Sequence, residues 1–482
     1  MLFCPCKLLS LVYIGIFIGS FLIFGLIFIV IILKQIISKS KNKRLAESSQ
    51  QCVGIFHLYC NAGGGGERVL WCAIRALQNK YEGSRILLYT GDTDVTPKQI
   101  LSKCRNNFNI IIDPDRLEFI FLNQRKWVEA EKYPVFTLLG QSIGSMIVGF
   151  EALLKFQPDI FMDTMGYAFT YPIFKYLGGS KIACYTHYPT ISTDMLRRVA
   201  SRKTAFNNKG HVAKNPFFTW AKLSYYRIYA SFYGMVGRCS NTVMVNSTWT
   251  ENHVNHIWNI PLRTHRVYPP CEVNHLKDIQ HVPNSDGNIY ILSVGQYRPE
   301  KDHPLILQSL YELRTYLQTD EALWDRVRLI FVGSCRNDED SERVKNLRDF
   351  SKHLALDDHV EFKVNASYQE LIQCYQKSLI GIHAMWNEHF GISVVELMAA
   401  GLIMIANRSG GPKMDIIETS EGSQTGFLAE DPEDYARCLA TVLYNTNEQN
   451  EKIRKAARAS VDRFSEKEFE DDFLRIVAPL FD

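Results

Sequence analysis

The chain has 482 residues, of which 46% are hydrophobic and 22% charged, and its net charge is only +3. This length allows a membrane segment plus two domains of about 150–220 residues each. The small net charge gives no support for nucleic-acid binding. The cysteines show neither zinc-site spacing nor a CxxC pair, so we expect reduced thiols in a cytosolic body.

An uncharged, strongly apolar stretch runs from Leu8 to Leu33. A helix of this length, at ~1.5 Å per residue, exceeds the ~30 Å hydrocarbon core and predicts one retained transmembrane helix. A cleaved signal peptide would have a shorter apolar region of about 7–15 residues and a small-x-small cleavage site. Because Lys7 alone precedes the stretch and several basic residues follow it, the positive-inside rule predicts a cytoplasmic body. The basic residues that follow are Lys34, Lys39, Lys41, Lys43 and Arg44.

The region after residue 50 alternates between strand-like and helical patterns. Residues 52–60 predict a buried strand, and residues 67–80 predict a helix with apolar side chains at helical spacing. Such alternation is typical of a parallel sheet covered on both faces by helices. Further predicted strands cover residues 85–90, 117–122, 159–164, 181–187 and 242–247.

A second set of strands begins after Pro269 and Pro270, which form a stiff connector. We therefore predict two doubly wound α/β domains in series. Strands are expected at residues 289–295, 327–333, 359–364, 378–384 and 401–407. The predicted units are an anchor and basic linker at 1–50, a first domain at 51–267, a second domain at 268–463, and an amphipathic helix at 464–482 that crosses back to the first domain.

One interval, residues 197–234, interrupts this alternation. Its first part, 197–214, is basic and polar, and its second part, 217–234, is rich in aromatic residues. Two interpretations stay open. One is a surface loop followed by a core helix, and the other is a surface that rests on anionic headgroups or holds a lipid-linked diphosphate.

The most informative segment, His383 to Pro412, contains two glutamates eight positions apart. Glu388 follows a predicted strand, and Glu396 lies one turn inside a helix opened by Gly391. The amides and dipole at that helix start favour an anionic group such as phosphate. A second turn supplies Gly410–Gly411, where a ligand can approach the backbone closely. We predict that both carboxylates face one cleft.

The E-x7-E pair, the glycine-rich loop near residue 63 and GQYRPEK at 295–301 resemble retaining glycosyltransferases of the GT-B fold. The strings NAGGGGERVLW, THYPTISTDML, VYPPC and QYRPEKDH are similar to the α-1,2-mannosyltransferase family of dolichol-linked oligosaccharide assembly. This resemblance implies two Rossmann-like domains facing across a cleft. It also implies transfer of the fourth and fifth mannoses from GDP-mannose to a dolichol-diphosphate glycan. The expected location is the cytosolic face of the endoplasmic reticulum membrane, beside other mannosyltransferases of the pathway.

The resemblance implies a donor site in the second domain. Arg298 and Lys301 would neutralise the diphosphate, although many relatives place the arginine directly after the strand glycine, where this chain has Gln296. Glu396 would accept hydrogen bonds from the donor ribose. The backbone amides that would complete the site belong to Phe390, Gly391, Ile392, Gly410 and Gly411.

The resemblance also assigns residues to the reacting sugars. Glu388 would hold the mannose hydroxyls. Whether Glu388 is also a nucleophile stays open, because retention can proceed by front-face attack instead of the two-carboxylate glycosidase scheme. His187, at the end of a predicted strand, would face the transferred sugar, and Asp194 is a weaker candidate for an acceptor hydroxyl.

Four consecutive glycines, Gly63, Gly64, Gly65 and Gly66, lie between the first predicted strand and helix. They do not form the dinucleotide fingerprint, since its third glycine would fall at Arg68, and no Walker lysine follows. We expect this loop to approach the donor phosphate from across the cleft and to leave room for the acceptor. A purely structural tight turn is the alternative.

We expect no metal and no cofactor. The D-x-D strings at 92–94, 113–115 and 338–340 lack the other residues of a metal site. Two other functions stay open on the sequence: a different lipid-directed transferase with a phosphoinositide acceptor or UDP-sugar donor, and a non-catalytic glycosyltransferase-like binding subunit.

Overall fold

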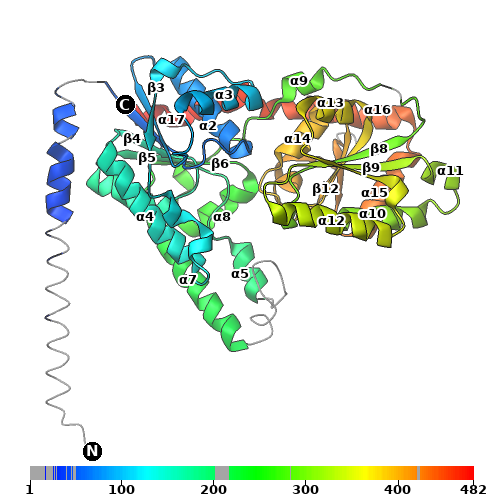
Figure 1. The fold of residues 1–482 in the computed structure, drawn as a ribbon, viewed down its shortest axis with the longest axis horizontal. Coiled ribbons are helices and arrows are strands. Elements are labelled where there is room, and N and C mark those ends of the chain that lie inside the picture. Colours follow the sequence, from blue (N-terminus) through cyan, green and yellow to red (C-terminus); the bar gives the residue numbers. More distant parts are fainter. Residues whose placement is uncertain are drawn as a thin grey trace, which may run out of the picture.

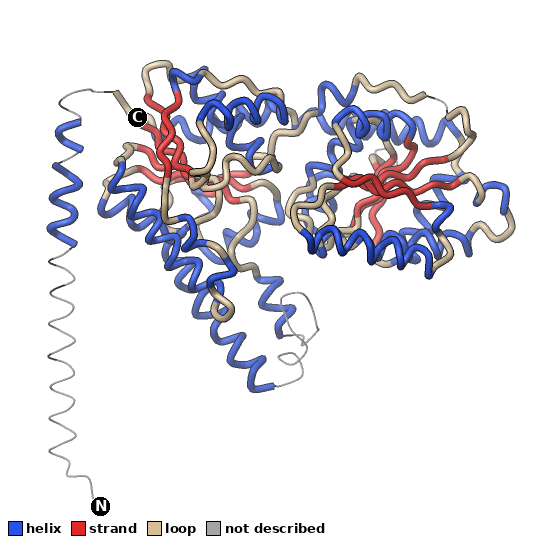
Figure 2. The backbone as a smooth tube through the Cα atoms, viewed as in Figure 1, coloured by secondary structure: helices blue, strands red, loops and turns tan. Residues whose placement is uncertain are grey.

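A computed structural model describes residues 50–200, 216–282, 284–420 and 424–482, together with residues 17, 25, 28, 30–39, 41–44 and 46. Two α/β domains, each built on a parallel sheet, lie side by side (Figure 1). Helices cover both faces of each sheet (Figure 2). This architecture confirms the predicted pair of doubly wound, Rossmann-like domains.

The first domain has a seven-stranded sheet in the order β3-β2-β1-β4-β5-β6-β7. Its strands are β1 Cys52–Phe56, β2 Arg85–Thr90, β3 Leu117–Phe121, β4 Ile160–Asp163, β5 Lys181–Thr186, β6 Thr242–Val245 and β7 Thr264–Arg266. Its main helices are α2 Gly65–Lys80, α3 Pro97–Phe108, α4 Thr137–Lys155, α5 Thr193–Ala200, α7 Pro216–Gly237 and α8 Thr248–Trp258.

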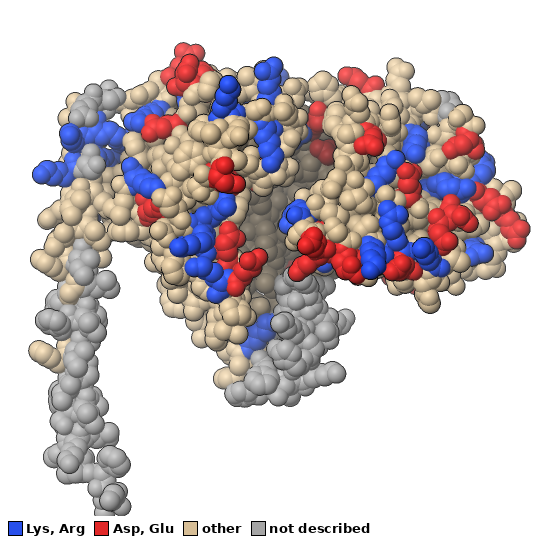
Figure 3. Space-filling model, viewed as in Figure 1, with Lys and Arg blue, Asp and Glu red and all other residues tan. Residues whose placement is uncertain are grey.

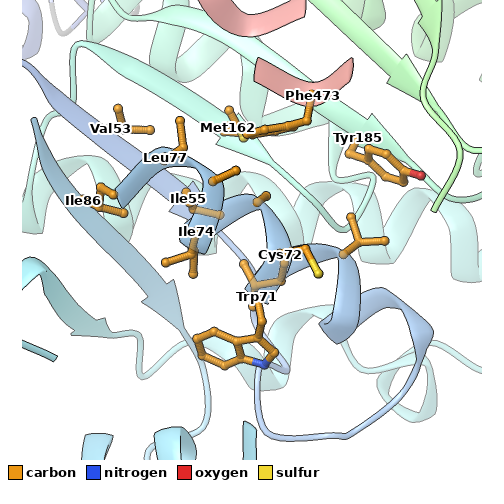
Figure 4. Close-up of a cluster of buried hydrophobic side chains, with 14 of the residues drawn as sticks. Val53, Ile55, Trp71, Cys72, Ile74, Leu77, Ile86, Met162, Tyr185 and Phe473 are labelled. Carbon is orange, nitrogen blue, oxygen red and sulfur yellow. The ribbon is translucent and has the colours of Figure 1, made fainter. Parts of the chain in front are cut away.

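The central strand β1 explains why this sheet is buried on both faces. Successive side chains of a strand point to opposite faces, so Ile55 joins one hydrophobic cluster and Phe56 joins another. Both side chains are fully buried. Helix α2 covers the Ile55 face and contributes Trp71 and Leu77 (Figure 4). The near-continuous apolar sequence of β1 is therefore typical of a central parallel strand.

The C-terminal helix α17, Glu466–Val477, packs on the first domain although it follows the second in the sequence. Phe473 lies in the same cluster as Val53 of β1 (Figure 4). Arg75 of α2 pairs with Glu466 at 2.8 Å and with Glu470 at 2.6 Å. The helix thus belongs to the core of the first domain.

The second domain has a six-stranded sheet in the order β10-β9-β8-β11-β12-β13. Its strands are β8 Ile289–Val294, β9 Val327–Gly333, β10 Val360–Val364, β11 Ser378–His383, β12 Ile403–Asn407 and β13 Gly426–Ala429. Its helices are α9 Val273–Lys277, α10 His303–Tyr316, α11 Glu321–Trp324, α12 Asp338–His353, α13 Tyr368–Lys377, α14 Ile392–Ala399, α15 Pro432–Tyr444 and α16 Asn447–Ser460.

The predicted transmembrane span lies almost entirely outside the described residues. The helical residues 30–39 overlap its end and, with residues 41–44, lead to the first domain, where Lys41 and Arg44 pair with Asp159 at 3.4 and 2.7 Å. Elsewhere in the described part of the chain, α4 alone is long and apolar enough to cross a membrane by length and composition. It packs on the sheet through buried residues such as Val148 and Ala152, as a helix of the first domain does.

The interrupting interval is described from residue 216 onward, and residues 201–215 lie outside the described part of the chain. Helix α7 buries Tyr229 and Tyr233 in the first domain but leaves Ile228 and Phe232 about half exposed or more, at 60% and 52%. The helix is therefore packed on one side only.

Candidate active site

The carboxyl ends of the parallel strands in both domains meet at one cleft, as expected for open α/β sheets. Gly65 lies so close to the second domain that a Cβ atom there would stand 2.6 Å from Ile392 Cδ1. The rings of Tyr188, after β5, and His389, after β11, stack with centroids 4.1 Å apart. The surface is hollowed between the two domains (Figure 3).

Glu388 lies in this cleft and is bound by two side chains. Lys301 Nζ is 2.6 Å from Glu388 Oε2, and His383 Nε2 donates to the same oxygen at 3.0 Å. Burial disfavours the charged carboxylate, but Lys301 and His383 outweigh it and hold the pKa of Glu388 well below its usual range. Glu388 is therefore an ionised acceptor of hydrogen bonds and not a proton donor.

Two glycines hold the Glu388 loop against the turn after β12. The Gly411 N–H donates to Glu388 O at 2.8 Å, and a Cβ atom at Gly410 would stand 2.2 Å from that oxygen. Gly410 has φ +55° and Gly391 has φ +110°, conformations that favour glycine. Helix α14 begins directly after Gly391 at Ile392. The backbone amides that were predicted to bind the donor, at residues 390–392 and 410–411, thus belong to one compact unit.

Glu396, the second carboxylate, has different neighbours. Arg68 of α2 and Glu272, at the start of α9, are the charged groups that act on it. Burial, together with the negative charge of Glu272, raises the pKa of Glu396 to about 7 against the pull of Arg68. Arg68 itself pairs with Glu272 at 3.5 Å and with Glu466 at 3.1 Å. The two glutamates therefore differ in charge at neutral pH, which their spacing alone does not reveal.

His187 lies on the first-domain side of the cleft, beside the glycine-rich loop. Its Nε2 atom is buried without a hydrogen-bond partner, and a Cβ atom at Gly66 would be 3.6 Å from it. Burial, reinforced by His57, lowers the pKa of His187 to about 4. The imidazole is therefore neutral at physiological pH, with one unused nitrogen that suits a sugar hydroxyl.

The glycine-rich loop is fixed by residues that the sequence analysis did not identify. Glu67 accepts a hydrogen bond from the Gly64 N–H and lies 3.4 Å from His57 Nε2. His57 Nδ1 in turn lies 2.8 Å from the Thr164 hydroxyl, and Gly63 adopts φ +88°. A glutamate three residues after the N-cap Gly64 is the available sequence signal, since its carboxylate can accept the N–H of the N-cap residue, as in one half of a capping box.

Arg298 and Asp194, the remaining predicted site residues, lie at the edges of the site. Arg298 is 3.7 Å from Glu300, and its buried Nε atom has no partner, so the guanidinium has unused hydrogen-bonding capacity. Asp194 accepts a hydrogen bond from Asn387 Nδ2 at 2.9 Å, across the two domains. Asn387 and His383 were not predicted. Their only sequence signal is their position close to Glu388: His383 is the last residue of β11, and Asn387 lies in the loop that follows.

The three D-x-D strings are engaged in local structure. Asp92 bonds to Arg125, Asp113 accepts from a backbone N–H two residues later, and Asp340 pairs with Arg343 at 3.1 Å. The described residues contain no group of three or more His, Cys, Asp or Glu side chains placed to hold a metal ion. Metal independence stays a prediction.

The two facing domains and the cleft between them have the GT-B arrangement, and solved structures share this fold. HepE of Anabaena, solved with UDP and glucose, is 16% identical with a TM-score of 0.58 and covers 88% of this chain and 99% of its own. Sucrose-phosphate synthase of Thermosynechococcus elongatus is 16% identical with a TM-score of 0.62 and covers 90% and 99%.

Sequence comparisons narrow the class to one family. A model described as "ALG11 mannosyltransferase N-terminus" matches residues 50–258, and "Glycosyl transferases group 1" matches 276–460. The human GDP-Man:Man(3)GlcNAc(2)-PP-Dol α-1,2-mannosyltransferase is 46% identical over 99% of this chain and 98% of its own length. The protein of that name from Dictyostelium discoideum is 47% identical over 90% and 85%. The chain belongs to this mannosyltransferase family, which confirms the family predicted from the motifs.

Proposed function

We propose that the chain transfers mannose from GDP-mannose to a dolichol-diphosphate-linked oligosaccharide, forming α-1,2 linkages with retention of configuration. The fourth and fifth mannoses are added in succession. The names of the relatives support both substrates. The observation that carries the proposal is the partly buried Lys301–Glu388 pair in a cleft lined by the glycine-rich loop and by His187.

In the proposed reaction, Lys301 turns from Glu388 toward the donor diphosphate and stabilises the negative charge that grows as GDP departs. Glu388 then accepts hydrogen bonds from the mannose hydroxyls, and His187 Nε2 binds another sugar hydroxyl. The amides around Gly391 and Gly411 contact the phosphates. The acceptor hydroxyl attacks the anomeric carbon on the face that the phosphate leaves, and the departing phosphate takes its proton.

The donor ribose binds at Glu396 in this scheme. Its carboxylate form accepts hydrogen bonds from both ribose hydroxyls, and Arg68 favours that form. Arg298, whose Nε atom has no partner in the free protein, reaches the diphosphate beside Lys301. Because these cations and amides supply the positive charge, the reaction is proposed to need no metal ion.

The N-terminal span is proposed to anchor the chain in the endoplasmic reticulum membrane, with the two domains in the cytosol. The basic residues after the span support this orientation. Lys41 and Arg44 also fix the linker to Asp159 of the first domain, so the body is held near the membrane surface. A lipid-linked acceptor is then presented at the same surface.

Parallel assays with GDP-mannose and UDP-sugars on one dolichol-linked acceptor test the proposal. We expect incorporation from GDP-mannose alone. Transfer from UDP-sugars alone would replace the mannosyl assignment with that of another lipid-directed transferase. Tight donor binding without transfer from any donor would indicate a non-catalytic binding subunit.

A further inference from the structure

Asp415 belongs to the second domain, but its carboxylate is bound by residues of the first. It lies in the turn Pro412–Ile416, which follows Gly410–Gly411, and its side chain is only 1% exposed. The Thr248 N–H, at the start of α8, donates to Asp415 Oδ2 at 3.0 Å, and the Thr248 hydroxyl donates to Oδ1 at 2.5 Å. Burial of a carboxylate is costly unless donors satisfy it, so this contact ties one domain to the other.

The turn that carries Asp415 is wider than a turn of an α-helix. The Ile417 N–H donates to Pro412 O at 2.9 Å, which is the i→i−5 bond of a π-helix. Single π-helical turns are rare and occur frequently at functional sites. Here the turn holds one residue more than an α-helical turn, and its Asp415 side chain reaches the start of α8.

Asp415 also lies where the chain passes between the domains. The Tyr268 hydroxyl, in the connector that enters the second domain, donates to Asp415 Oδ1 at 3.0 Å. Arg463, in the segment that returns to the first domain, donates to the Asp415 carbonyl oxygen at 2.6 Å. The two passing segments are joined by a hydrogen bond from the Cys271 N–H to Phe464 O at 2.9 Å. Short connecting segments of this kind act as hinges, so Asp415 is anchored at the hinge.

The same contact connects the two candidate catalytic side chains, one in each domain. In the second domain, the Gly411 N–H, four residues before Asp415, donates to Glu388 O at 2.8 Å. In the first domain, the side-chain amide of Asn246, two residues before α8, donates to His187 O at 2.9 Å. A continuous path of short chain segments and hydrogen bonds thus runs from Glu388 to His187 and crosses between the domains at Asp415.

We propose that Asp415 is a positioning residue that fixes Glu388 relative to His187 and thereby aligns the donor sugar with the acceptor hydroxyl. The inference rests on the proposed function, in which both side chains bind hydroxyls of the transferred sugar. Asp415 itself contacts no substrate in this scheme. Because the second domain alone supplies most of the donor site, a loosened joint should slow the chemical step more than it weakens donor binding.

The test removes single groups from the joint in the full-length protein. Tyr268→Phe deletes one hydroxyl, and Asp415→Asn replaces one acceptor oxygen by an amide group that faces other donors. We expect kcat to fall about fivefold in Tyr268→Phe and at least about tenfold in Asp415→Asn. The KM for GDP-mannose should stay within about twofold of wild type. Tyr444→Phe and Asp349→Asn, at exposed positions of α15 and α12, are the matched controls.

A double variant separates positioning from a general loss of stability. If Tyr268 acts through Asp415, the Tyr268→Phe, Asp415→Asn double variant should be about as slow as Asp415→Asn alone. Fully additive losses would overturn the assignment. A lower urea midpoint with unchanged kcat per folded molecule would also overturn it, because that is the result of a merely structural role.

Two further points keep the test decisive. If Asp415→Asn does not fold, Tyr268→Phe and Thr248→Val are judged by the same fall in kcat, since each removes only one hydroxyl donor to the carboxylate. Absence of mannose transfer by the wild type would contradict the proposed function. Transfer by the wild type with unchanged kcat in the folded variants would contradict only the role of Asp415.

Discussion

Lys301, after β8, and Glu388, after β11, link two loops of the second domain, with 2.6 Å between Nζ and Oε2. The same carboxylate oxygen accepts the hydrogen bond of His383. The lysine is thus held at the cleft by a partner that a donor diphosphate can replace. The pair keeps a positive charge at the cleft before the substrate arrives, so in the proposed reaction only the Lys301 side chain has to turn to stabilise the charge on the leaving group.

Removal of the lysine charge should slow the chemical step. We expect Lys301→Ala to lower turnover at least about tenfold, which corresponds to about 1.4 kcal/mol of barrier. Lys345→Ala, on the exposed surface of α12, is the control. Thermal unfolding of each variant separates a loss of turnover from a loss of fold. Wild-type rates in folded Lys301→Ala would contradict the assigned role.

The close approach of the glycine-rich loop to Ile392 predicts a specific rescue. A methyl group at Gly65 would overlap Ile392 Cδ1, the flexible end of that side chain, so we expect Gly65→Ala to displace the Ile392 side chain and lower kcat/KM about threefold. Ile392→Val removes that terminal carbon. The Gly65→Ala, Ile392→Val double variant should recover most of the loss in a steady-state assay. If the second change gives no recovery, the contact between the domains is not the cause.

The raised pKa of Glu396 predicts a pH dependence of donor binding. With a pKa of about 7, the carboxyl group is mostly protonated below that value and ionised above it. Because the ionised form accepts both ribose hydroxyls, the KM for GDP-mannose should fall as the pH rises from about 6 to about 8. Glu396→Gln should raise this KM about tenfold and remove the dependence on pH. A wild-type profile in the variant would disprove the role.

Two neutral histidines predict destabilisation by acid. Burial lowers the pKa of His187 and of His389 to about 4, from 6.5 in the unfolded chain. Between these values the unfolded state binds more protons, so the free energy of unfolding should fall as the pH is lowered. Each histidine contributes up to about 1.4 kcal/mol per pH unit. Urea titrations at pH 7 and pH 5 should show that the free energy of unfolding falls less between these pH values in His389→Gln than in the wild type. An equal fall in both proteins would refute this explanation.

Chelation tests the proposed metal independence. Because Lys301 and backbone amides supply the charge at the diphosphate, we expect a chelator to leave the rate within about twofold of the untreated enzyme. Measurement requires a metal-free acceptor preparation. Full loss of activity, restored by added manganese, would require a metal in the donor site.

The strand–loop–helix order of each domain was predictable because parallel strands are continuous apolar runs. Glu388 and Lys301 were both expected at strand ends of the same domain, and the structure brings them together. The edge strands β7 and β13 were not predicted, since they are short and only partly buried, unlike the four-residue strands β4 and β6, which are buried throughout. The predicted strand at 52–60 ends at Phe56, and residues 57–60, although mostly buried, lead into the turn before the glycines.

Contacts between the domains could not be predicted from local patterns. The Asn387–Asp194 hydrogen bond and the Tyr188–His389 stack depend on how two distant segments pack. The different charges of Glu388 and Glu396 also depend on packing. Lys301 lowers the pKa of Glu388, whereas burial and the nearby Glu272 raise the pKa of Glu396. Sequence identified the groups, whereas packing set their protonation.

Product analysis with a defined dolichol-linked Man(3)GlcNAc(2) acceptor and GDP-mannose tests the central claim most directly. The expected product carries two additional mannoses, each in an α-1,2 linkage, and the Lys301→Ala variant forms it at least about tenfold more slowly. A product with another linkage or anomeric configuration, or no transfer from GDP-mannose by the folded wild type, would contradict the account.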